Sequence, residues 1–135
     1  MNCSDFINGL KSNFNTLGIN DVYILEGSLI IPIEEEDGMP SYKIAVSMIE
    51  EGYISIYTSF KHSAVLKKEI VEILRVCNTF NEQSFLKFIV KKQFIKVEYN
   101  MPELSNDDIN KVISIITIIP NILFDFYKDL SKVLA

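Results

Sequence analysis

The stretch YKIAVSMIEEGYISIYTSF, residues 42–60, alternates apolar and polar side chains on either side of Glu50-Glu51-Gly52. Such alternation is typical of strands with one buried face, and a short connection that contains glycine joins antiparallel neighbours. A third alternating run, 22–33, precedes this pair across an acidic turn. We therefore predict a meander of three antiparallel strands at 22–33, 42–48 and 54–60.

Helical periodicity flanks the meander on both sides. Before it, the apolar residues of 4–17 recur every three or four positions, and Gly18 can end that helix in a left-handed conformation. After it, Ser63 can cap a second helix whose apolar face runs from Leu66 to Phe80. We expect the chain to leave this second helix within 78–84.

Two further strands and a long helix complete the predicted order. Residues 85–90 and 94–99 are strand-like runs around Lys91-Lys92-Gln93, a turn without glycine. The sequence LSNDDI, residues 104–109, places a serine cap and two aspartates at the positive end of a helix dipole. Because one helical register holds on both sides of Pro120, we predict a single kinked helix. The predicted order is α-β-β-β-α-β-β-α.

The chain length and the predicted element order indicate one α+β domain over residues 1–135, with an antiparallel sheet packed by helices. The chain is 48% hydrophobic and 23% charged, which excludes a disordered protein. Its net charge of −5 argues against nucleic acid as the main partner. Yet residues 1–60 hold 2 basic and 9 acidic groups (−7), whereas 61–100 hold 8 and 4 (+4). Four lysines of this basic segment lie near Phe85 and Phe94: Lys87, Lys91, Lys92 and Lys96. They form either a surface for a nucleic acid or an acidic peptide, or only the solvated face of a half-buried sheet.

Cysteine use and the apolar segments bear on location. Cys3 and Cys77 lie far apart, and we expect no disulfide and a reducing environment. The first ten residues do not resemble a secretory signal. Polar residues interrupt 112–126, so we expect no membrane-spanning helix and no membrane partner. These expectations together place the protein in the cytoplasm.

No residue pattern points to a reaction. The chain has one histidine, His62, in a strand-to-helix turn, where we interpret it as a solvated turn residue or a contact for a small ligand. Cys77 lies on a predicted core face and is interpreted as packing. The acidic run 34–37 is either a solvated hairpin tip or a cation site. Nucleotide-binding and nucleophile-elbow motifs are missing from the sequence, so we expect no catalytic, cofactor-binding or metal-binding residues and no enzyme activity.

The last helix has more apolar surface than a single packing partner needs. Its apolar arc spans about 200°, against somewhat over 100° for an ordinary surface helix. The sheet can cover one part of this arc, and the first helix or a partner protein can cover the other. The candidate partner-binding residues lie along one margin: Ile115, Ile118, Ile122, Phe126 and Val133.

The element order resembles that of the YbjN-like family of putative bacterial sensory-transduction regulators, which shares the fold of type III secretion chaperones. The local likeness is in FIKVEY at 94–99, followed by MPELSNDD at 101–108, a last strand leading into a capped C-terminal helix. The resemblance implies a non-catalytic, cytoplasmic, homodimeric protein that binds a protein segment along apolar surface. Two alternatives remain open: a small-ligand or metal sensor or enzyme using 34–37 or His62, and nucleic-acid binding through the 87–96 hairpin.

Overall fold

The structure, a computed structural model, describes residues 3–49, 53–101 and 108–134 and confirms an α+β domain with an antiparallel sheet. The predicted helix start at 104–109 falls largely outside the described residues, since the last helix is described from Asp108. The elements are α1 (Cys3–Thr16), β1 (Tyr23–Leu25), β2 (Ser28–Ile33), β3 (Tyr42–Ile49), β4 (Tyr53–Lys61), α2 (Lys67–Gln83), β5 (Lys87–Val90), β6 (Phe94–Met101) and α3 (Asp108–Leu134).

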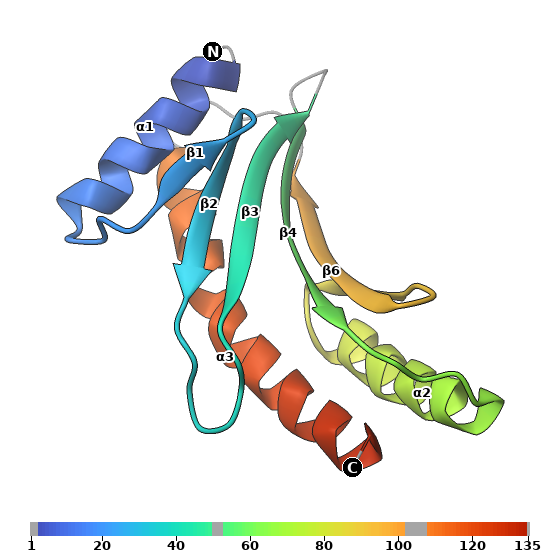
Figure 1. Ribbon diagram of the computed structural model, residues 1–135. Helices are drawn as coiled ribbons and strands as arrows, with labels where there is room; N and C mark the ends of the chain where they lie inside the picture. Colours follow the sequence, from blue (N-terminus) through green and yellow to red (C-terminus); the bar gives the residue numbers. More distant parts are fainter. Residues whose placement is uncertain (1–2, 50–52, 102–107, 135) are drawn as a thin grey trace.

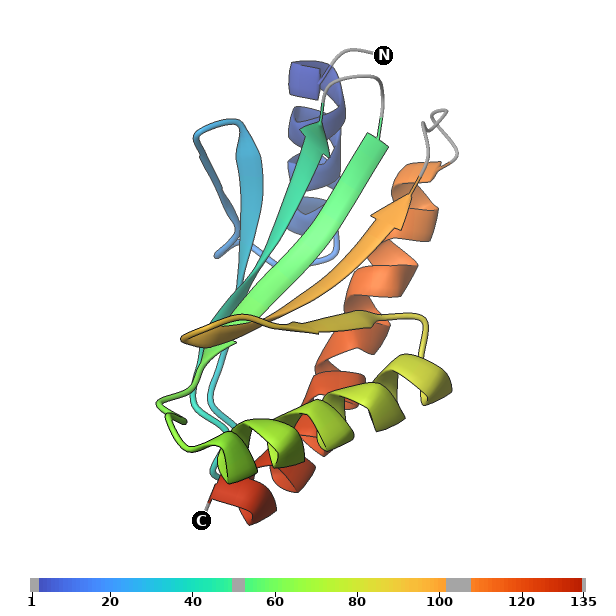
Figure 2. The same ribbon diagram turned by 90° about the vertical axis from the view of Figure 1, so that its right-hand side faces the viewer.

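The six strands form one antiparallel sheet in the order β1-β2-β3-β4-β6-β5. Figure 1 views the sheet from the face that no helix covers, and α3 runs diagonally behind it. Figure 2 shows the same arrangement from the side, with α3 to the right of the strands and α2 across the lower end of the molecule. The core therefore lies between one sheet face and the helices, and the other sheet face is open.

The predicted first strand, 22–33, is wrong in one respect, because the chain turns back within it. Glu26 and Gly27 both have positive φ, 50° and 83°, which is typical of a type I′ turn between two strands. This turn separates β1 from β2 and pairs Leu25 with Ser28. The sheet consequently has one more strand than predicted, and β1 forms one of its edges.

The predicted bounds of the second helix are also wrong. The helix begins at Lys67 rather than after Ser63, and it continues through 78–84 as far as Gln83. Near its end, the Asn81 side chain accepts a bond from the Phe88 amide (2.6 Å) and donates one to the Phe88 carbonyl (3.1 Å). Asn81 thus satisfies backbone groups on the outer edge of β5, which leaves them unavailable to another strand.

The predicted end of the first helix is confirmed. Gly18 has φ of 86°, and the amide of Ile19 donates back to the carbonyl of Phe14 over 2.9 Å. Gly18 itself donates to Asn15 over 3.0 Å, which completes a Schellman motif. This stop lets the chain turn from α1 into the sheet.

The last helix is continuous through Pro120, as predicted. It packs a stripe with helical spacing against the sheet and the other helices: Val112, Ile116, Ile119, Leu123, Phe126 and Leu130. Its exposed side is mainly polar and includes Lys111, Ser114, Thr117, Asn121, Asp125 and Lys128. Among the described residues, α3 is the one helix that is long and apolar enough, by length and composition alone, to cross a membrane. The polar residues within 112–126 had led us to expect no such helix.

Two buried groups make the fold sensitive to alkali. Cys77 is 1% exposed, and burial raises its pKa from 9.0 to about 11. Burial, together with the nearby Glu36 carboxylate, raises the pKa of Tyr42 to about 12, and among the described residues its hydroxyl has no hydrogen-bond partner. In both cases the unfolded chain ionises first, so the stability present at neutral pH is lost as pH rises.

We therefore predict that the free energy of unfolding falls between pH 9 and 11, by up to about 2.5 kcal/mol from Cys77 alone. Urea unfolding at several pH values measures this decline. Cys77→Ala should make the curve shallower from pH 9 upward and leave the decline due to Tyr42, which begins near pH 10 and which Tyr42→Phe should remove. A Cys77→Ala curve parallel to that of the wild type would contradict the assignment.

Candidate functional site

The structure separates the five predicted partner-binding residues of α3. Phe126 is fully buried, with its ring centre 4.5 Å from that of Phe88 and 5.4 Å from that of Phe80, so its prediction as a partner contact is wrong. Ile118 is 47% exposed. The other three are half-buried: Ile115, Ile122 and Val133.

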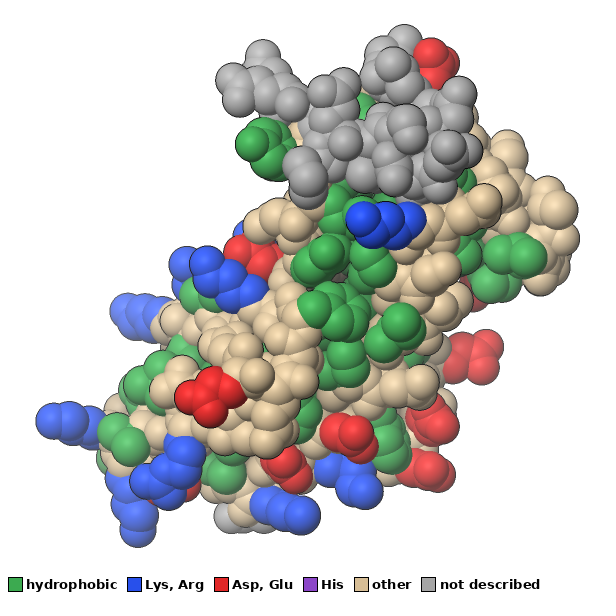
Figure 3. Space-filling view, turned by 180° about the vertical axis from the view of Figure 1, so that it is seen from behind, with side chains coloured by type: hydrophobic (Ala, Val, Ile, Leu, Met, Phe, Trp, Pro, Cys, Tyr) green, Lys and Arg blue, Asp and Glu red, His purple; other side chains and the backbone are tan. Residues whose placement is uncertain are grey.

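The structure also shows what covers the wide apolar arc of α3. The sheet covers one side, where the Phe126 ring packs against Phe60 of β4 and Phe88 of β5. The helices α1 and α2 also pack against α3, and α1 lies near its first turn. At that contact a side chain on Gly9 would come within 3.3 Å of the Ile109 side chain, so the two helices approach closely there. Figure 3 shows hydrophobic side chains still visible across the middle of the helical face. The apolar surface of α3 that its neighbours leave uncovered is thus a half-buried band with little fully exposed area.

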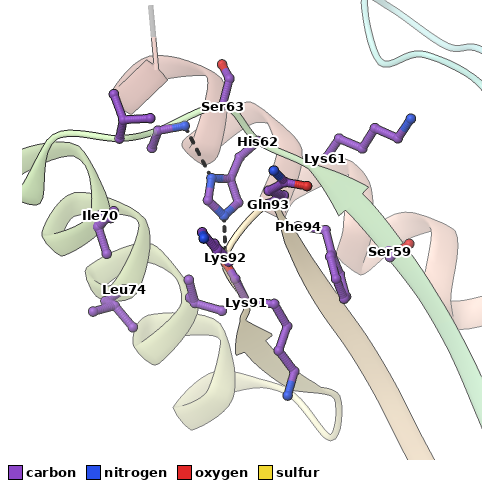
Figure 4. A pocket seen from close by; sticks show the side chains of 13 residues that line it. Ser59, Lys61, His62, Ser63, Ile70, Leu74, Lys91, Lys92, Gln93 and Phe94 are labelled. Atoms are coloured by element: carbon purple, nitrogen blue, oxygen red, sulfur yellow. Dashed lines mark hydrogen bonds between the residues drawn. The ribbon is translucent and has the colours of Figure 1, made fainter.

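A more open site lies at the end of the sheet, where β4 leads towards α2 and the β5–β6 turn approaches. It is an open groove of about 1290 Å³, called the basic groove here. Figure 4 shows Ile70 and Leu74 of α2 on one side and Ser59 and Phe94 of the strands on the other. Its lining combines apolar residues (Ala64, Val65, Ile70, Leu74, Val90, Phe94), three lysines (Lys61, Lys91, Lys92) and Ser59, His62, Ser63 and Gln93.

His62 joins the two walls of the basic groove, the segment 62–65 after β4 and the turn 91–93 between β5 and β6. Its Nδ1 accepts a hydrogen bond from the Ala64 amide over 3.3 Å, so Nε2 carries the proton and donates to the Lys91 carbonyl over 2.9 Å. The His62 amide donates to the Gln93 carbonyl over 3.0 Å. His62 is only 9% exposed, so its interpretation as a solvated turn residue is wrong. With both ring nitrogens bonded to backbone, His62 is a positioning residue (Figure 4).

The lysines of the basic groove have no counterions in the described part of the chain. Lys61, Lys91 and Lys92 are exposed and form none of the ion pairs found there. No acidic residue lines the basic groove. In a protein of net charge −5, this concentration of unpaired positive charge produces a local attraction for acidic groups.

Apolar side chains protrude beside these lysines. Val65 and Leu66 are 84% and 64% exposed, and Leu74 and Phe94 are 41% and 39% exposed. Clustered exposed apolar residues with a polar rim are typical of an interaction site. The basic groove therefore offers both apolar contact area and charge.

The other predicted lysines lie elsewhere. The register places Lys87 opposite Glu98 and Lys96 opposite Ser59, on the open sheet face. Lys96 pairs with Glu98 over 3.2 Å and lies over the Tyr57 ring. Lys87 and Lys96 are thus outside the lining of the basic groove, although Ser59 opposite Lys96 belongs to it, and the pair at the turn, Lys91 and Lys92, lines the groove itself.

The acidic run 34–37 forms an exposed hairpin tip. Glu36 and Met39 exchange two backbone hydrogen bonds of 3.0 and 2.8 Å, and the turn between them has positive φ at Asp37 (43°) and Gly38 (89°). In the described part of the chain, no three His, Cys, Asp or Glu side chains gather in a way that could hold a metal ion. The tip is therefore closed by paired backbone at Glu36 and Met39 and is open to solvent.

Sequence reasoning singled out His62 and Lys91-Lys92-Gln93 but did not bring them together. Their meeting depends on the pairing of Lys61 with Phe94, which links β4 to β6 across 33 residues of sequence (94 minus 61). It also missed Val65 and Leu66, which were assigned to a helix start. The excess of basic residues in 61–100 was the one signal for this surface. No protein-family model matches the chain, and no curated protein matches its sequence.

Proposed function

We propose that the protein is a non-catalytic, protein-binding module, chaperone-like or a regulatory adaptor, that holds an acidic and partly apolar protein segment in the basic groove. The observation that carries the proposal is the presence of exposed apolar side chains between unpaired lysines in an acidic protein. The homodimer and the cytoplasmic location that the YbjN-like resemblance implies are part of the proposal.

The two kinds of residue in the basic groove have different roles in such binding. Val65, Leu74 and Phe94 supply apolar area whose burial by a partner gives affinity. Lys91 and Lys92 are exposed, so they attract an acidic segment and favour it over a neutral one more than they tighten the final complex. A segment with alternating acidic and aliphatic residues fits both.

Two features of the described residues favour binding over catalysis. Both ring nitrogens of His62 are bonded to backbone groups and are not free to move a proton to a substrate. The Cys77 thiol is buried, and its raised pKa keeps it protonated, which makes it a poor nucleophile. These observations support a non-catalytic role.

A direct test uses a fluorescein-labelled peptide of alternating glutamate and leucine. We predict that the wild-type protein binds this peptide, measured by fluorescence polarisation, and that binding weakens with added salt. Lys91→Glu combined with Lys92→Glu should weaken binding by at least about tenfold, equivalent to about 1.4 kcal/mol. Val65→Asp should weaken it as well, because it removes apolar contact.

The matched control is Lys87→Glu combined with Lys111→Glu, which makes the same change in charge at exposed positions outside the basic groove. It should retain wild-type affinity. Peptides of alternating lysine and leucine, or glutamate and serine, should bind poorly. Equal loss of affinity in both double variants would show a general charge effect, and equal binding of all three peptides would refute selective recognition.

A further inference from the structure

The chain itself carries a segment with the charge that the basic groove lacks. Residues 34–38, the acidic hairpin, form the exposed tip between β2 and β3. In the described part of the chain, the carboxylates of Glu34, Glu35 and Asp37 form none of the observed ion pairs. The tip is held by the paired backbone of Glu36 and Met39, so little order has to be gained on binding.

The acidic hairpin does not reach the basic groove of its own chain. Figure 1 shows the β2–β3 connection and α2 on opposite sides of the lower end of the molecule. No ion pair found among the described residues joins the two. Four consecutive acidic residues and three unpaired lysines are therefore left facing solvent at separate places.

We infer that the acidic hairpin of a second copy occupies the basic groove, and that two copies exchange hairpins in a closed dimer. A two-fold axis makes this contact twice, because each copy offers both the hairpin and the groove. Charge complementarity identifies the occupant, since chains of net charge −5 otherwise repel each other.

This inference rests on the proposed function, since the hairpin is an acidic segment of the kind that the basic groove is proposed to hold. It adds regulation to that function. A client segment and the partner copy's hairpin would compete for one site, so the dimer is the closed form and client binding opens it. The dimer contact lies in the hairpin and groove rather than on α3, where Ile118 is the one exposed large apolar residue among those described.

The decisive experiment is a charge exchange read by light scattering behind a sizing column. The wild-type chain of 15.5 kDa should elute with a mass of about 31 kDa (twice 15.5) at low salt and should dissociate as salt is raised. One variant combines Glu34→Lys with Glu35→Lys, and a second combines Lys91→Glu with Lys92→Glu. Each alone should be monomeric, because like charges then meet at both contacts.

An equimolar mixture of the two variants should recover the dimer mass, since unlike charges face each other again at both contacts. Ile118→Asp and the control Lys87→Glu with Lys111→Glu should remain dimeric. The inference is overturned by a monomeric wild type, by a mixture that stays monomeric, or by loss of the dimer in Ile118→Asp alone.

The peptide assay separates this inference from the proposed function. The Glu34→Lys, Glu35→Lys variant keeps an intact basic groove, so it should bind the glutamate–leucine peptide at least as tightly as the wild type. If it binds the peptide while the mixture fails to dimerise, the dimer inference alone is wrong. If it does not bind the peptide, the proposed function falls too.

Discussion

Replacing Phe126 with alanine should lower the free energy of unfolding by about 3–5 kcal/mol, measured by urea denaturation. The Phe126 side chain is fully buried, and its ring contacts those of Phe60, Phe80 and Phe88, with the Phe80 ring packed edge-on. Truncation removes the apolar burial and the aromatic contacts at once and leaves a cavity where β4, α2, β5 and α3 meet.

The matched control on the same helix is Ile118→Ala. Because Ile118 is 47% exposed, this variant should lose less than about 1 kcal/mol. Phe126→Asp should fail to fold, as expected for an unpaired charge in the core. A folded Phe126→Asp protein with reduced self-association would contradict the buried position and favour Phe126 as an interface residue.

The error about Phe126 shows what a helical pattern can and cannot determine. Periodicity correctly located the apolar side of α3 and its continuity through Pro120. An arc of about 200° does not reveal which part is covered, however, since that depends on where the sheet, α1 and α2 lie. At 100° per residue Phe126 lies about 40° from Val112, which is in the middle of the buried stripe, and Ile118 lies about 120° away.

The sheet was predictable where alternation is strong and the turns are recognisable. The strands β3, β4 and β6 follow from the period of two in their sequences, which places apolar residues at alternate positions on the face packed against the helices. Burial is less regular than the sequence pattern, because β3 and β4 also bury Ala45 and Ser55 between the apolar positions. The β1–β2 turn was not predictable by the same rule. Its first central residue is Glu26, which adopts φ of 50° although asparagine, aspartate and glycine are the usual residues there.

The candidate site was predictable only in parts. The excess of basic over acidic residues identified the segment 61–100, and the single histidine drew attention to the connection between β4 and α2. Neither observation shows that the turn after β5 comes beside the residues after β4. That juxtaposition follows from the long-range pairing of β4 with β6, and from the hydrogen bond between His62 and the Lys91 carbonyl.

His62→Ala should therefore weaken both the fold and the basic groove. The variant leaves the Ala64 amide and the Lys91 carbonyl without their partner. Ala64 is buried, and an unsatisfied buried group costs about 1–3 kcal/mol, whereas the carbonyl of the exposed Lys91 can bond to water. We expect a loss of about 1–3 kcal/mol in the free energy of unfolding. Peptide affinity should also fall, because His62 no longer links the turn that carries Lys91 and Lys92 to the segment that contains Ala64.

Two conservative variants divide this effect between the two ring nitrogens. His62→Asn places an acceptor near the position of Nδ1 and can keep the Ala64 bond, whereas His62→Gln places a donor near Nε2 and can keep the Lys91 bond. If His62 acts by joining the two walls, His62→Gln should retain more peptide affinity than His62→Asn at equal stability. A residue with a purely structural role affects binding only through the fraction of folded protein. Equal peptide affinity in both variants, measured well below their unfolding transitions, would therefore assign His62 a role in stability alone.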